Sequence, residues 1–588
     1  MRIDIRNLRT SDDVAEFMRW LGESRPVLAL DIETSGLAWH RDRIRLCQFG
    51  DERSAWVLTY DDWRGVVREA LRTYRGPIVG HNVRFDLHFL AHDLGIPTAE
   101  LGWWRIHDTM LMAHLTDPTE PKGLKPLAAR LIDPAAVAGQ QELDDDMRRG
   151  KWDWASVPID LPSYRFYAGL DTSLTAILYG KLMPHMERKY ADAYRLEQVC
   201  QHPLFAMERH GMLLDADYTR HCREELDCTA QDVERSIEER WGVSVGSLDQ
   251  IASAMLADGW EPTELTPTGK PSLRADVMEQ IDHPLARDVI RWRLANKASQ
   301  TWLRNFLDTA DPETQRVYPN IRQVAARTGR MSITDPPLQT LPRESDAAAR
   351  GLPSIRNCFV APEGSSLISA DFSGIEARLF AHFAAEPDML RTIHEGGDLH
   401  ALVAAAAYQV PIDSVTKAQR QIAKAVNFAS LYGAGPAKVA LTAGISEDES
   451  RDFFDRRDVA FPGIRRFQRA ITNRADEQRQ QGERANVRTH IGSRISIKDD
   501  EPTYRLVNYL IQGSAAVVLK DRIVSLHNAG LTDLMLLPIH DEVVFEVPDD
   551  SVSDAYDVIA SAMPDSSTFS VPLAVDISEP VHSWGMAK

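Results

Sequence analysis

Short apolar runs and alternating runs predict a sheet in the first part of the chain. Residues 27–30 are all apolar, and residues 44–49 alternate between apolar and polar positions with a period of two. Both patterns are typical of neighbouring strands in one sheet. Helix-forming stretches follow at residues 85–93 and 108–115, so residues 1–185 predict an α/β or α+β domain.

The middle of the chain, residues 186–315, has helical character. Residues 217–241 are polar and contain neither Gly nor Pro. A turn-rich segment at 261–272 follows, and helical sequence then resumes through Leu307. This pattern predicts two long helices joined by a tip loop.

Strand-like and helical patterns alternate again in the last part of the chain. Residues 366–370 are strand-like and end at Asp371. Two apolar runs within residues 534–547 flank His540-Asp541-Glu542 and predict a β-hairpin. Residues 399–499, between these strands, are mostly helical. The predicted fold class of the whole chain is therefore mixed α/β (α+β).

The composition is that of a globular protein. Hydrophobic residues make up 44% and charged residues 26% of the 588 positions, and about 150 residues per domain gives roughly four domains or subdomains. The apolar stretches fall short of the ~20 residues of a membrane span, and the N-terminus has no secretory h-region. The five cysteines form no C-x-x-C pair, so we expect neither disulfides nor zinc, a cytoplasmic location and no membrane association.

Two acidic residues, Asp31 and Glu33, lie at the end of the first apolar strand. Alternation puts both carboxylates on one face, where they repel each other unless a cation lies between them. Hard cations such as Mg²⁺ prefer oxygen ligands, and a pair of them is a usual device for cleaving phosphodiesters. A D-x-E pair alone is a weak signal, because a solvated strand end has the same pattern.

Two later segments strengthen the hypothesis of a metal site. Asn82-Val83-Arg84-Phe85-Asp86 follows a strand-like stretch, and Tyr167 and Asp171 are four residues apart and so share one helical face. Together with Asp31-Ile32-Glu33-Thr34, and in this order, these segments resemble the motifs of DEDDy 3′–5′ exonucleases.

The resemblance to these exonucleases implies a role for each matching residue. Tyr167 would orient the attacking water, Leu37 would pack against the terminal base, and Thr34 would lie along the frayed strand. The two metal ions would be held by Asp31, Glu33, Asp86 and Asp171. A tyrosine standing alone at position 167 would as readily be a buried core residue.

Residues 420–433 are the most informative stretch of the chain. Arg420, Lys424 and Phe428 recur at intervals of four, so they share one face of a helix. Two cations beside an aromatic ring suit a nucleoside triphosphate, because the cations meet the phosphates and the ring meets the base. An amphipathic helix with solvated cations and a core Phe would show the same spacing.

The full pattern R-x-x-x-K-x-x-x-F-x-x-x-Y-G, which ends at Tyr432 and Gly433, resembles motif B of family A (DNA polymerase I-type) DNA polymerases. The other motifs of that family are present in order, with residues 371–378 resembling motif A and residues 540–542 resembling motif C. Further segments that match are 328–332, 338–342, 397–400 and 505–516. The resemblance covers nearly the whole chain from residue 25 onward.

The resemblance to family A implies a two-metal nucleotidyl transfer. Asp371 and Asp541 would hold two Mg²⁺ ions, with Mn²⁺ as a possible substitute, and Glu542 would be an auxiliary carboxylate near the primer end. Lys424 would also donate a proton to the departing pyrophosphate. The residues expected to bind the dNTP are Arg420, Lys424, Phe428, Tyr432, His400 and Glu376. The residues expected to contact the primer–template DNA are Arg330, Gln339, Arg505, Asn508 and Gln512.

The resemblance also implies a domain order. An RNase H-like exonuclease domain at 1–185 would be followed by a right-hand polymerase domain, whose parts are the thumb at 186–315, the palm at 316–398 and 500–588, and the fingers at 399–499. This compact arrangement resembles phage-encoded replicative enzymes, and we expect a monomer, in the host cytoplasm if phage-encoded. The chain departs from the family at three positions that bear on sugar selection and fidelity, namely Gly374, Ala377 and Thr340.

Three hypotheses compete. The first is a proofreading DNA polymerase. The second is a stand-alone 3′–5′ exonuclease of the RNase D type with a degenerate, polymerase-derived binding module, and the third is a non-catalytic nucleic-acid-binding scaffold. Asp371, Lys424 and Asp541 distinguish these hypotheses. A stand-alone exonuclease has no need for a motif B helix, and a non-catalytic scaffold has no need for an intact pair of metal-binding aspartates. Both acidic sets are intact, which favours the first.

The net charge of −19, taken alone, argues against a polyanionic partner. Its distribution along the chain changes that interpretation. Residues 541–588 hold ten acidic residues and a single basic one, Lys588. Three segments are basic and contain no acid, namely 315–334, 415–432 and 484–498. We therefore expect a locally basic cleft and a DNA affinity that falls steeply with salt.

Overall fold

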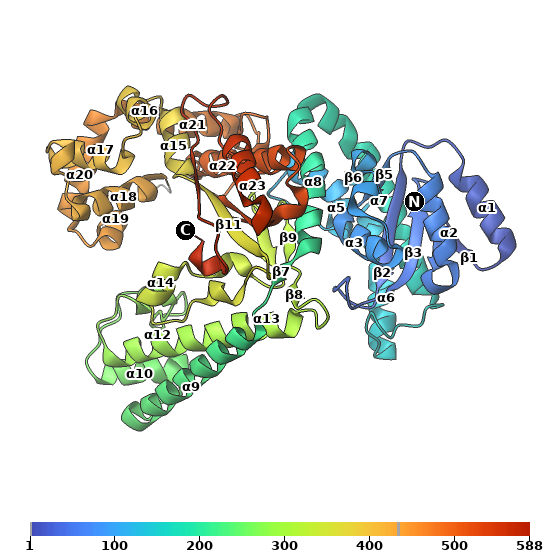
Figure 1. Ribbon diagram of the computed structural model, residues 1–588, viewed down its shortest axis with the longest axis horizontal. Coiled ribbons are helices and arrows are strands. Elements are labelled where there is room, and N and C mark those ends of the chain that lie inside the picture. Colours follow the sequence, from blue (N-terminus) through green and yellow to red (C-terminus); the bar gives the residue numbers. More distant parts are fainter. Residues whose placement is uncertain (1–2, 432–434, 588) are drawn as a thin grey trace.

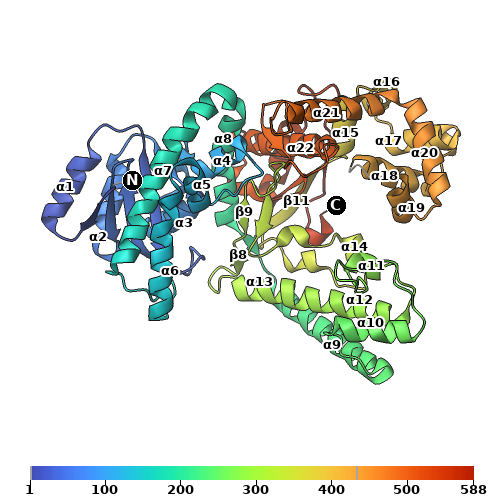
Figure 2. The ribbon, with the colours of Figure 1, turned by 180° about the vertical axis from the view of Figure 1, so that it is seen from behind.

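The structure is a computed structural model that describes residues 3–431 and 435–587. The N-terminal part, in blue, lies at one side of the molecule (Figure 1). A green helical arm and an orange helical arm extend from a central sheet, and the C-terminus returns to the centre between them, as the view from behind also shows (Figure 2). No helix of the described ranges is long and apolar enough to cross a membrane.

The N-terminal part is built on a six-stranded sheet of order β1-β4-β3-β2-β5-β6. Helices cover both faces of this sheet. On one face, Leu28 and Leu30 of β2 share a hydrophobic cluster with residues of α1–α3, and on the opposite face Ala29 of the same strand packs against α7. The strands are β1 (Asp4–Leu8), β2 (Leu28–Thr34), β3 (Ile44–Gly50), β4 (Ser54–Thr59), β5 (Ile78–Gly80) and β6 (Ile106–Asp108). The helices are α1 (Ser11–Leu21), α2 (Tyr60–Thr73), α3 (Val83–Leu94), α4 (Thr109–Thr116), α5 (Leu124–Leu131), α6 (Ala138–Gly150) and α7 (Pro162–Lys189).

The helix α8 (Ala191–His210) lies between the N-terminal part and the centre, where it packs against α22 (Arg505–Asn528) and β14 (Met535–Ile539). The green arm follows. Its long helices α9 (Ala216–Trp241) and α12 (Pro284–Lys297) pack side by side, as predicted, and the tip adds two short helices, α10 (Leu248–Ala257) and α11 (Ala275–Met278). A π-helical stretch, Ala298–Leu303, leads into α13 (Arg304–Thr309) at the base of the arm.

The central sheet has the order β14-β15-β11-β16 and is antiparallel throughout. Its strands besides β14 are β11 (Ser365–Phe372), β15 (Glu542–Pro548) and β16 (Val575–Ile577). The helices α15 (Ile375–Ala384), α22 and α23 (Val552–Ala562) pack around it, and the short strands β9 (Asn320–Arg322) and β10 (Ser332–Thr334) pair with each other nearby.

The orange arm is helical, as predicted for residues 399–499. Its helices are α16 (Pro387–His394), α17 (Leu399–Tyr408), α18 (Lys417–Leu431), α19 (Pro436–Ala443), α20 (Glu447–Ala460) and α21 (Pro462–Gln480). The short hairpin of β12 (Asn486–Arg488) and β13 (Arg494–Ser496) then returns the chain to α22.

Candidate active sites

The N-terminal acidic site consists of Asp31, Glu33, Asp86 and Asp171. Alternation along β2 turns Asp31 and Glu33 to the face that α7 covers. Asp86, near the start of α3, accepts a hydrogen bond of 2.9 Å from the backbone N–H of Ile32. This bond places its carboxylate beside those of β2.

Two glycines let α7 cross the sheet closely. A Cβ on Gly169 would lie 2.6 Å from Ile5 Cγ2, and a Cβ on Gly50 would lie 2.4 Å from Thr172 Oγ1. Because larger side chains would push the helix away, this crossing brings the neighbouring Asp171 to the sheet. Tyr167 lies one turn earlier on the same helix, as the spacing predicted.

A buried lysine completes the N-terminal acidic site. Lys125 on α5 is 6% exposed, its Nζ contacts Oδ1 of Asp171, and it lies 4.3 Å from the centroid of the Tyr167 ring. Within the described ranges, no three His, Cys, Asp or Glu side chains converge closely enough to hold one metal ion as they stand. The cation that the carboxylates meet in this structure is therefore an ammonium group.

Burial dominates the electrostatics of the N-terminal acidic site. It raises the pKa of Asp31 to about 6, although Gln48 donates a hydrogen bond of 2.7 Å to that carboxylate. Burial and the charge of Asp31 raise the pKa of Glu33 and of Asp86 well above the usual range. Burial lowers the pKa of Lys125 to about 8, against the pull of the acids. Ionised carboxylates here need a cation close by.

The central acidic site consists of Asp371, Asp541 and Glu542. Antiparallel register pairs Asp371 on β11 with Glu542 on β15, and Phe372 donates a backbone hydrogen bond of 3.2 Å to the carbonyl of Asp541. The turn between β14 and β15 is His540-Asp541, and His540 adopts a positive φ of 55°. That left-handed residue costs conformational energy, and the turn it makes sets Asp541 beside Asp371.

The two aspartates of the central acidic site have few neutralising partners. Burial, followed by the charge of Asp541, raises the pKa of Asp371 to about 6, and burial raises the pKa of Asp541 as well. Arg343 Nη2 lies 3.3 Å from Asp371 Oδ2. The other oxygen, Asp371 Oδ1, is buried and has no hydrogen-bond partner among the described residues.

Glu542 has partners of its own. Its Oε1 lies 3.7 Å from Arg356 Nη1 and accepts a hydrogen bond of 3.4 Å from Trp584 Nε1. Burial still raises the pKa of the Glu542 carboxyl. In this structure Glu542 therefore belongs to a buried ion pair with Arg356.

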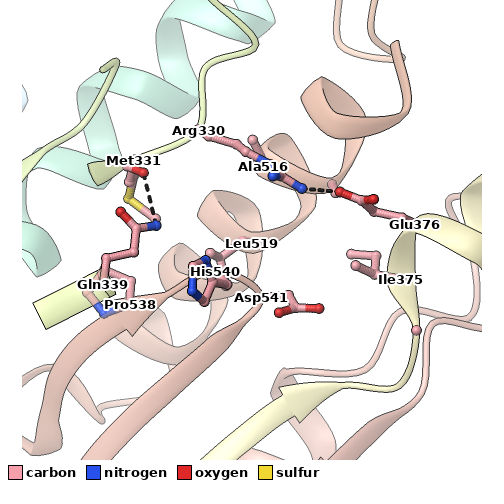
Figure 3. Close-up of a pocket in the computed structure, with 12 residues that line it drawn as sticks. Arg330, Met331, Gln339, Ile375, Glu376, Ala516, Leu519, Pro538, His540 and Asp541 are labelled. Carbon is pink, nitrogen blue, oxygen red and sulfur yellow. Dashed lines mark hydrogen bonds and ion pairs between the residues drawn. The ribbon is translucent and has the colours of Figure 1, made fainter. Parts of the chain in front are cut away.

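A cavity of about 270 Å³ opens beside Asp541 and is lined by the sequence-predicted residues Arg330, Gln339 and Glu376. Figure 3 shows Arg330 reaching across this cavity to Glu376, with which it forms a close ion pair. Gln339 donates a hydrogen bond of 3.4 Å to the carbonyl of Met331. The predicted contacts to DNA and to the nucleotide sugar thus meet at one cavity.

The cations of the motif B helix, α18, lie on the orange arm. Arg420 forms a close ion pair with Asp398, His400 Nδ1 lies 3.2 Å from Asn427 Nδ2, and Lys424 is exposed. The predictions for Tyr432 and for the side chain of Phe428 lie outside what the structure describes.

The remaining predicted DNA contacts lie on two elements. Arg505, Asn508 and Gln512 follow one another along α22, where Arg505 Nη1 pairs with Glu501 at 2.9 Å. Asn508 is 8% exposed, and its Oδ1 has no hydrogen-bond partner in the described part of the chain. Leu37, just after β2, is 83% exposed although it is apolar.

The expected basic cleft needs a correction. Three arginines of segment 315–334 pair with acids that lie far away in sequence, namely Arg316 with Glu546, Arg327 with Glu501 and Arg330 with Glu376. Arg484, from segment 484–498, contacts Asp117 at 2.5 Å and so faces the N-terminal part. The charge count of a short sequence segment omits acidic residues that the fold brings close from other parts of the chain. The prediction therefore overstated the free positive charge of these segments.

A nuclease-type acidic site on one sheet and a second acidic site between two helical arms define a nucleic acid polymerase joined to a nuclease. The family model described as "DNA polymerase family A" matches residues 216–586, and the model described as "3'-5' exonuclease" matches residues 5–187. The chain belongs to DNA polymerase family A and is a DNA-directed DNA polymerase with a 3′–5′ exonuclease domain. Both kinds of domain generally use divalent metal ions.

Relatives support the same assignment. The DNA polymerase of Mycobacterium phage D29 is 30% identical, over 99% of this chain and 97% of the phage protein. DNA polymerase I of Pseudomonas aeruginosa is 28% identical, over 96% of this chain and 64% of that protein. The fold is shared with a solved structure of the POL domain of Pol1 from M. smegmatis in complex with DNA primer-template and dNTP, at a TM-score of 0.79 and 24% identity, over 99% of this chain and 100% of that one. The polymerase hypothesis is therefore the right one of the three.

Several residues at the two acidic sites were not predicted from the sequence. Lys125 carried a signal, since it lies three residues before Ala128 on the apolar face of α5 and is an uncommon residue type for such a face. Arg343, Arg356 and Trp584 carried none, because they reach the central acidic site only through the tertiary fold.

Proposed function

We propose that this polymerase extends a primer 3′ end with dNTPs by nucleotidyl transfer at Asp371 and Asp541. A separate site at Asp31, Glu33 and Asp86 removes nucleotides from the same end. The observation that carries this proposal is the presence of two acidic sites on two different sheets, each with carboxyl pKa values raised by burial.

The donor atoms of both sites fit Mg²⁺, with Mn²⁺ as a substitute. Every proposed ligand is a carboxylate oxygen, which hard cations prefer. The buried, unpartnered Oδ1 of Asp371 supports a cation beside it. Asp371 and Asp541 would hold the ions at the central site, and Asp31, Glu33, Asp86 and Asp171 would hold them at the N-terminal site. When bound, such ions supply charge neutralisation and an activated oxygen nucleophile.

The orange arm brings the nucleotide to the central site. Arg420, Lys424 and His400 bind the triphosphate, and Lys424 donates the proton that pyrophosphate takes up. Glu376 excludes a ribose 2′-hydroxyl, and Glu542 acts as an auxiliary carboxylate near the primer end. Phe428 and Tyr432 pack on the incoming sugar and the templating base.

Polar side chains around the cavity read the primer–template. Arg330 and Gln339 at the cavity, with Arg505, Asn508 and Gln512 on α22, touch minor-groove acceptors that are common to all base pairs, so they check geometry and not sequence. At the N-terminal site, Leu37 packs on the terminal base and Tyr167 orients the attacking water.

We propose the same division of the chain as the family resemblance implies, with an exonuclease domain at 1–185, a thumb at 186–315, a palm at 316–398 and 500–588, and fingers at 399–499. Primer–template DNA and dNTPs are the partners, and the M. smegmatis complex with these same two ligands supports this proposal. The protein acts as a monomer in the cytoplasm, which is the host cytoplasm if the protein is phage-encoded.

The experiment that tests the proposal is the incubation of the protein with a 5′-labelled primer on a single-stranded template. With Mg²⁺ and dNTPs the primer lengthens, with Mg²⁺ alone it shortens from the 3′ end, and with EDTA its length stays the same. Extension without shortening in any condition would overturn the exonuclease assignment, and shortening without extension would overturn the polymerase mechanism.

A further inference from the structure

The loop that carries Leu37, residues 35–42, is closed on itself. The Ala38 backbone N–H donates a hydrogen bond of 2.9 Å to Asp42 Oδ2, and the Asp42 backbone N–H donates one of 2.7 Å to the Ala38 carbonyl. A Cβ on Gly36 would lie 2.3 Å from the Asp42 carboxylate. We call residues 35–42 the Leu37 loop, and these internal contacts hold its two ends together.

One end of the Leu37 loop is fastened to the green arm. Arg41 Nη1 donates a hydrogen bond of 3.0 Å to the carbonyl of Asp308, and Nη2 makes a close hydrogen bond to the carbonyl of Ala310. These carbonyls end α13, at the base of the arm. The last carbonyls of a helix lack intrahelical partners and carry its negative pole, so a forked guanidinium suits them.

Trp39 of the Leu37 loop packs against α3, the helix that carries the proposed metal ligand Asp86. The Trp39 ring is 5.7 Å from the His88 ring at an interplanar angle of 16°, and His88 lies two residues after Asp86. The same Trp39 ring is 4.9 Å from the ring of Tyr318, which belongs to the segment that follows the arm. The loop therefore touches α3, the helix that carries Asp86, on one side and the segment that follows the arm on the other.

We propose that Arg41 is a positioning residue that ties the Leu37 loop to the green arm, so that a primer end held on duplex DNA is received at the exonuclease site in a fixed place. The inference rests on the proposed function, in which Leu37 packs on the terminal base and residues 186–315 form the thumb, and it adds that this thumb, the green arm, holds the duplex. Arg41 touches neither acidic site. Its bonds join the loop beside the N-terminal site to the base of the green arm.

The inference predicts different behaviour for two substrates, a free single strand and a mismatched primer end on a duplex. A free single strand reaches the exonuclease site without the arm, so its trimming does not depend on Arg41. A mismatched primer end on a duplex arrives from the arm, so its excision does. Loss of two hydrogen bonds from an exposed arginine, together worth a modest equilibrium shift, predicts a fall of about three- to tenfold for the duplex substrate alone.

The test measures single-turnover excision of a mismatched primer terminus on a template and of the same strand without a template. The variants are Arg41→Ala and a matched control, Arg43→Ala, which removes an exposed arginine two residues further along with no side-chain partner found in the described ranges. We expect Arg41→Ala to lower the duplex-to-single-strand rate ratio about three- to tenfold and Arg43→Ala to leave it unchanged. Arg41→Lys, which keeps the charge without the fork, gives an intermediate ratio.

An unchanged ratio for Arg41→Ala, or an equal fall for Arg43→Ala, overturns the inference. Failure of the proposed function looks different: wild-type protein would then trim neither substrate above the level of Asp31→Ala. The two failures are therefore read from different variants in the same assay.

Discussion

The two acidic sites of this polymerase meet different resident cations. At the N-terminal site, the buried Lys125, 6% exposed, contacts Asp171 from the neighbouring helix α5. At the central site, Arg343 approaches Asp371 at 3.3 Å from a loop, and its own side chain is 55% exposed. The first site is closed around its cation, and the second borders a cavity.

This difference agrees with what each site is proposed to receive. The N-terminal site is proposed to receive a single-strand end, and a buried ammonium group that neutralises its carboxylates is compatible with that task. The central site is proposed to admit a duplex end and a triphosphate. The cations proposed to bind that triphosphate lie on the orange arm, where Arg420 pairs with Asp398. The N-terminal site thus has a counter-charge within its own fold, whereas the proposed triphosphate cations of the central site lie on a separate arm.

The largest expected effect is the separation of the two activities. Asp541→Ala removes a proposed ligand of the central site only, so we expect primer extension to fall by about 10³-fold or more, with single-strand trimming retained. Asp31→Ala is the reciprocal variant and should abolish trimming while leaving extension. Both variants are assayed on one labelled primer, and loss of both activities in either variant would contradict the independence of the sites.

The next effect concerns Lys125. Lys125→Met keeps the length of the side chain but leaves the carboxylates facing each other, so we expect the free energy of unfolding in EDTA to fall by about 3 kcal/mol, as is usual for breaking a buried ion pair. Added Mg²⁺ should restore part of this loss, because a divalent ion takes over the neutralisation. Thermal unfolding with and without Mg²⁺ measures both quantities.

Lys122→Met is the matched control for this prediction, since Lys122 lies three residues earlier and is not in contact with Asp171 in the described structure. An equal loss of stability in both variants would mean that Lys125 acts through general charge and not through the acidic site.

Much of the candidate chemistry could be predicted from sequence, because carboxylates such as Asp31 and Glu33 sit at strand ends that a period-two pattern reveals. The hairpin at His540-Asp541 was likewise predictable from two apolar runs around polar residues. Chain-local patterns of this kind fix which side chains share a face, and the sheets then bring them together.

The counter-ions could not be predicted in this way. Glu546 lies 230 residues from Arg316, and Glu542 lies 186 residues from Arg356, so only the tertiary fold pairs them. The sequence therefore shows the positive charges of the basic segments without their partners, and the fold partly neutralises these charges. The same reason explains why Arg41 gave no signal, since its partners are backbone carbonyls of a distant helix.

A smaller effect is the pH dependence of the metal-free protein. The pKa of Asp31 is raised from 3.8 to about 6, so the folded protein holds that proton more tightly than the unfolded chain does. The free energy of unfolding therefore falls as the pH rises from about 4 to 6. We expect the melting temperature in EDTA to fall across this window and to fall less for Asp31→Asn, which cannot ionise. Parallel curves for the two proteins would contradict the assignment of this proton to Asp31.

The smallest effect tests how far the cavity of the central site is closed by its own charges. Glu376→Gln keeps the size of the side chain but removes the charge that holds Arg330 in the free protein. Because Arg330 then reaches DNA without first leaving a partner, we expect primer–template to bind about threefold more tightly without dNTP, consistent with the modest worth of a partly exposed ion pair.

The affinity is measured by fluorescence anisotropy at one fixed salt concentration, since the loss of any negative charge also strengthens DNA binding. Glu363→Gln, at an exposed glutamate just before β11, is the control for that general effect. If both variants tighten binding equally, the Arg330–Glu376 pair does not oppose DNA binding. If only Glu376→Gln does, the polymerase site, like the exonuclease site, is held by an internal ion pair until its substrate arrives.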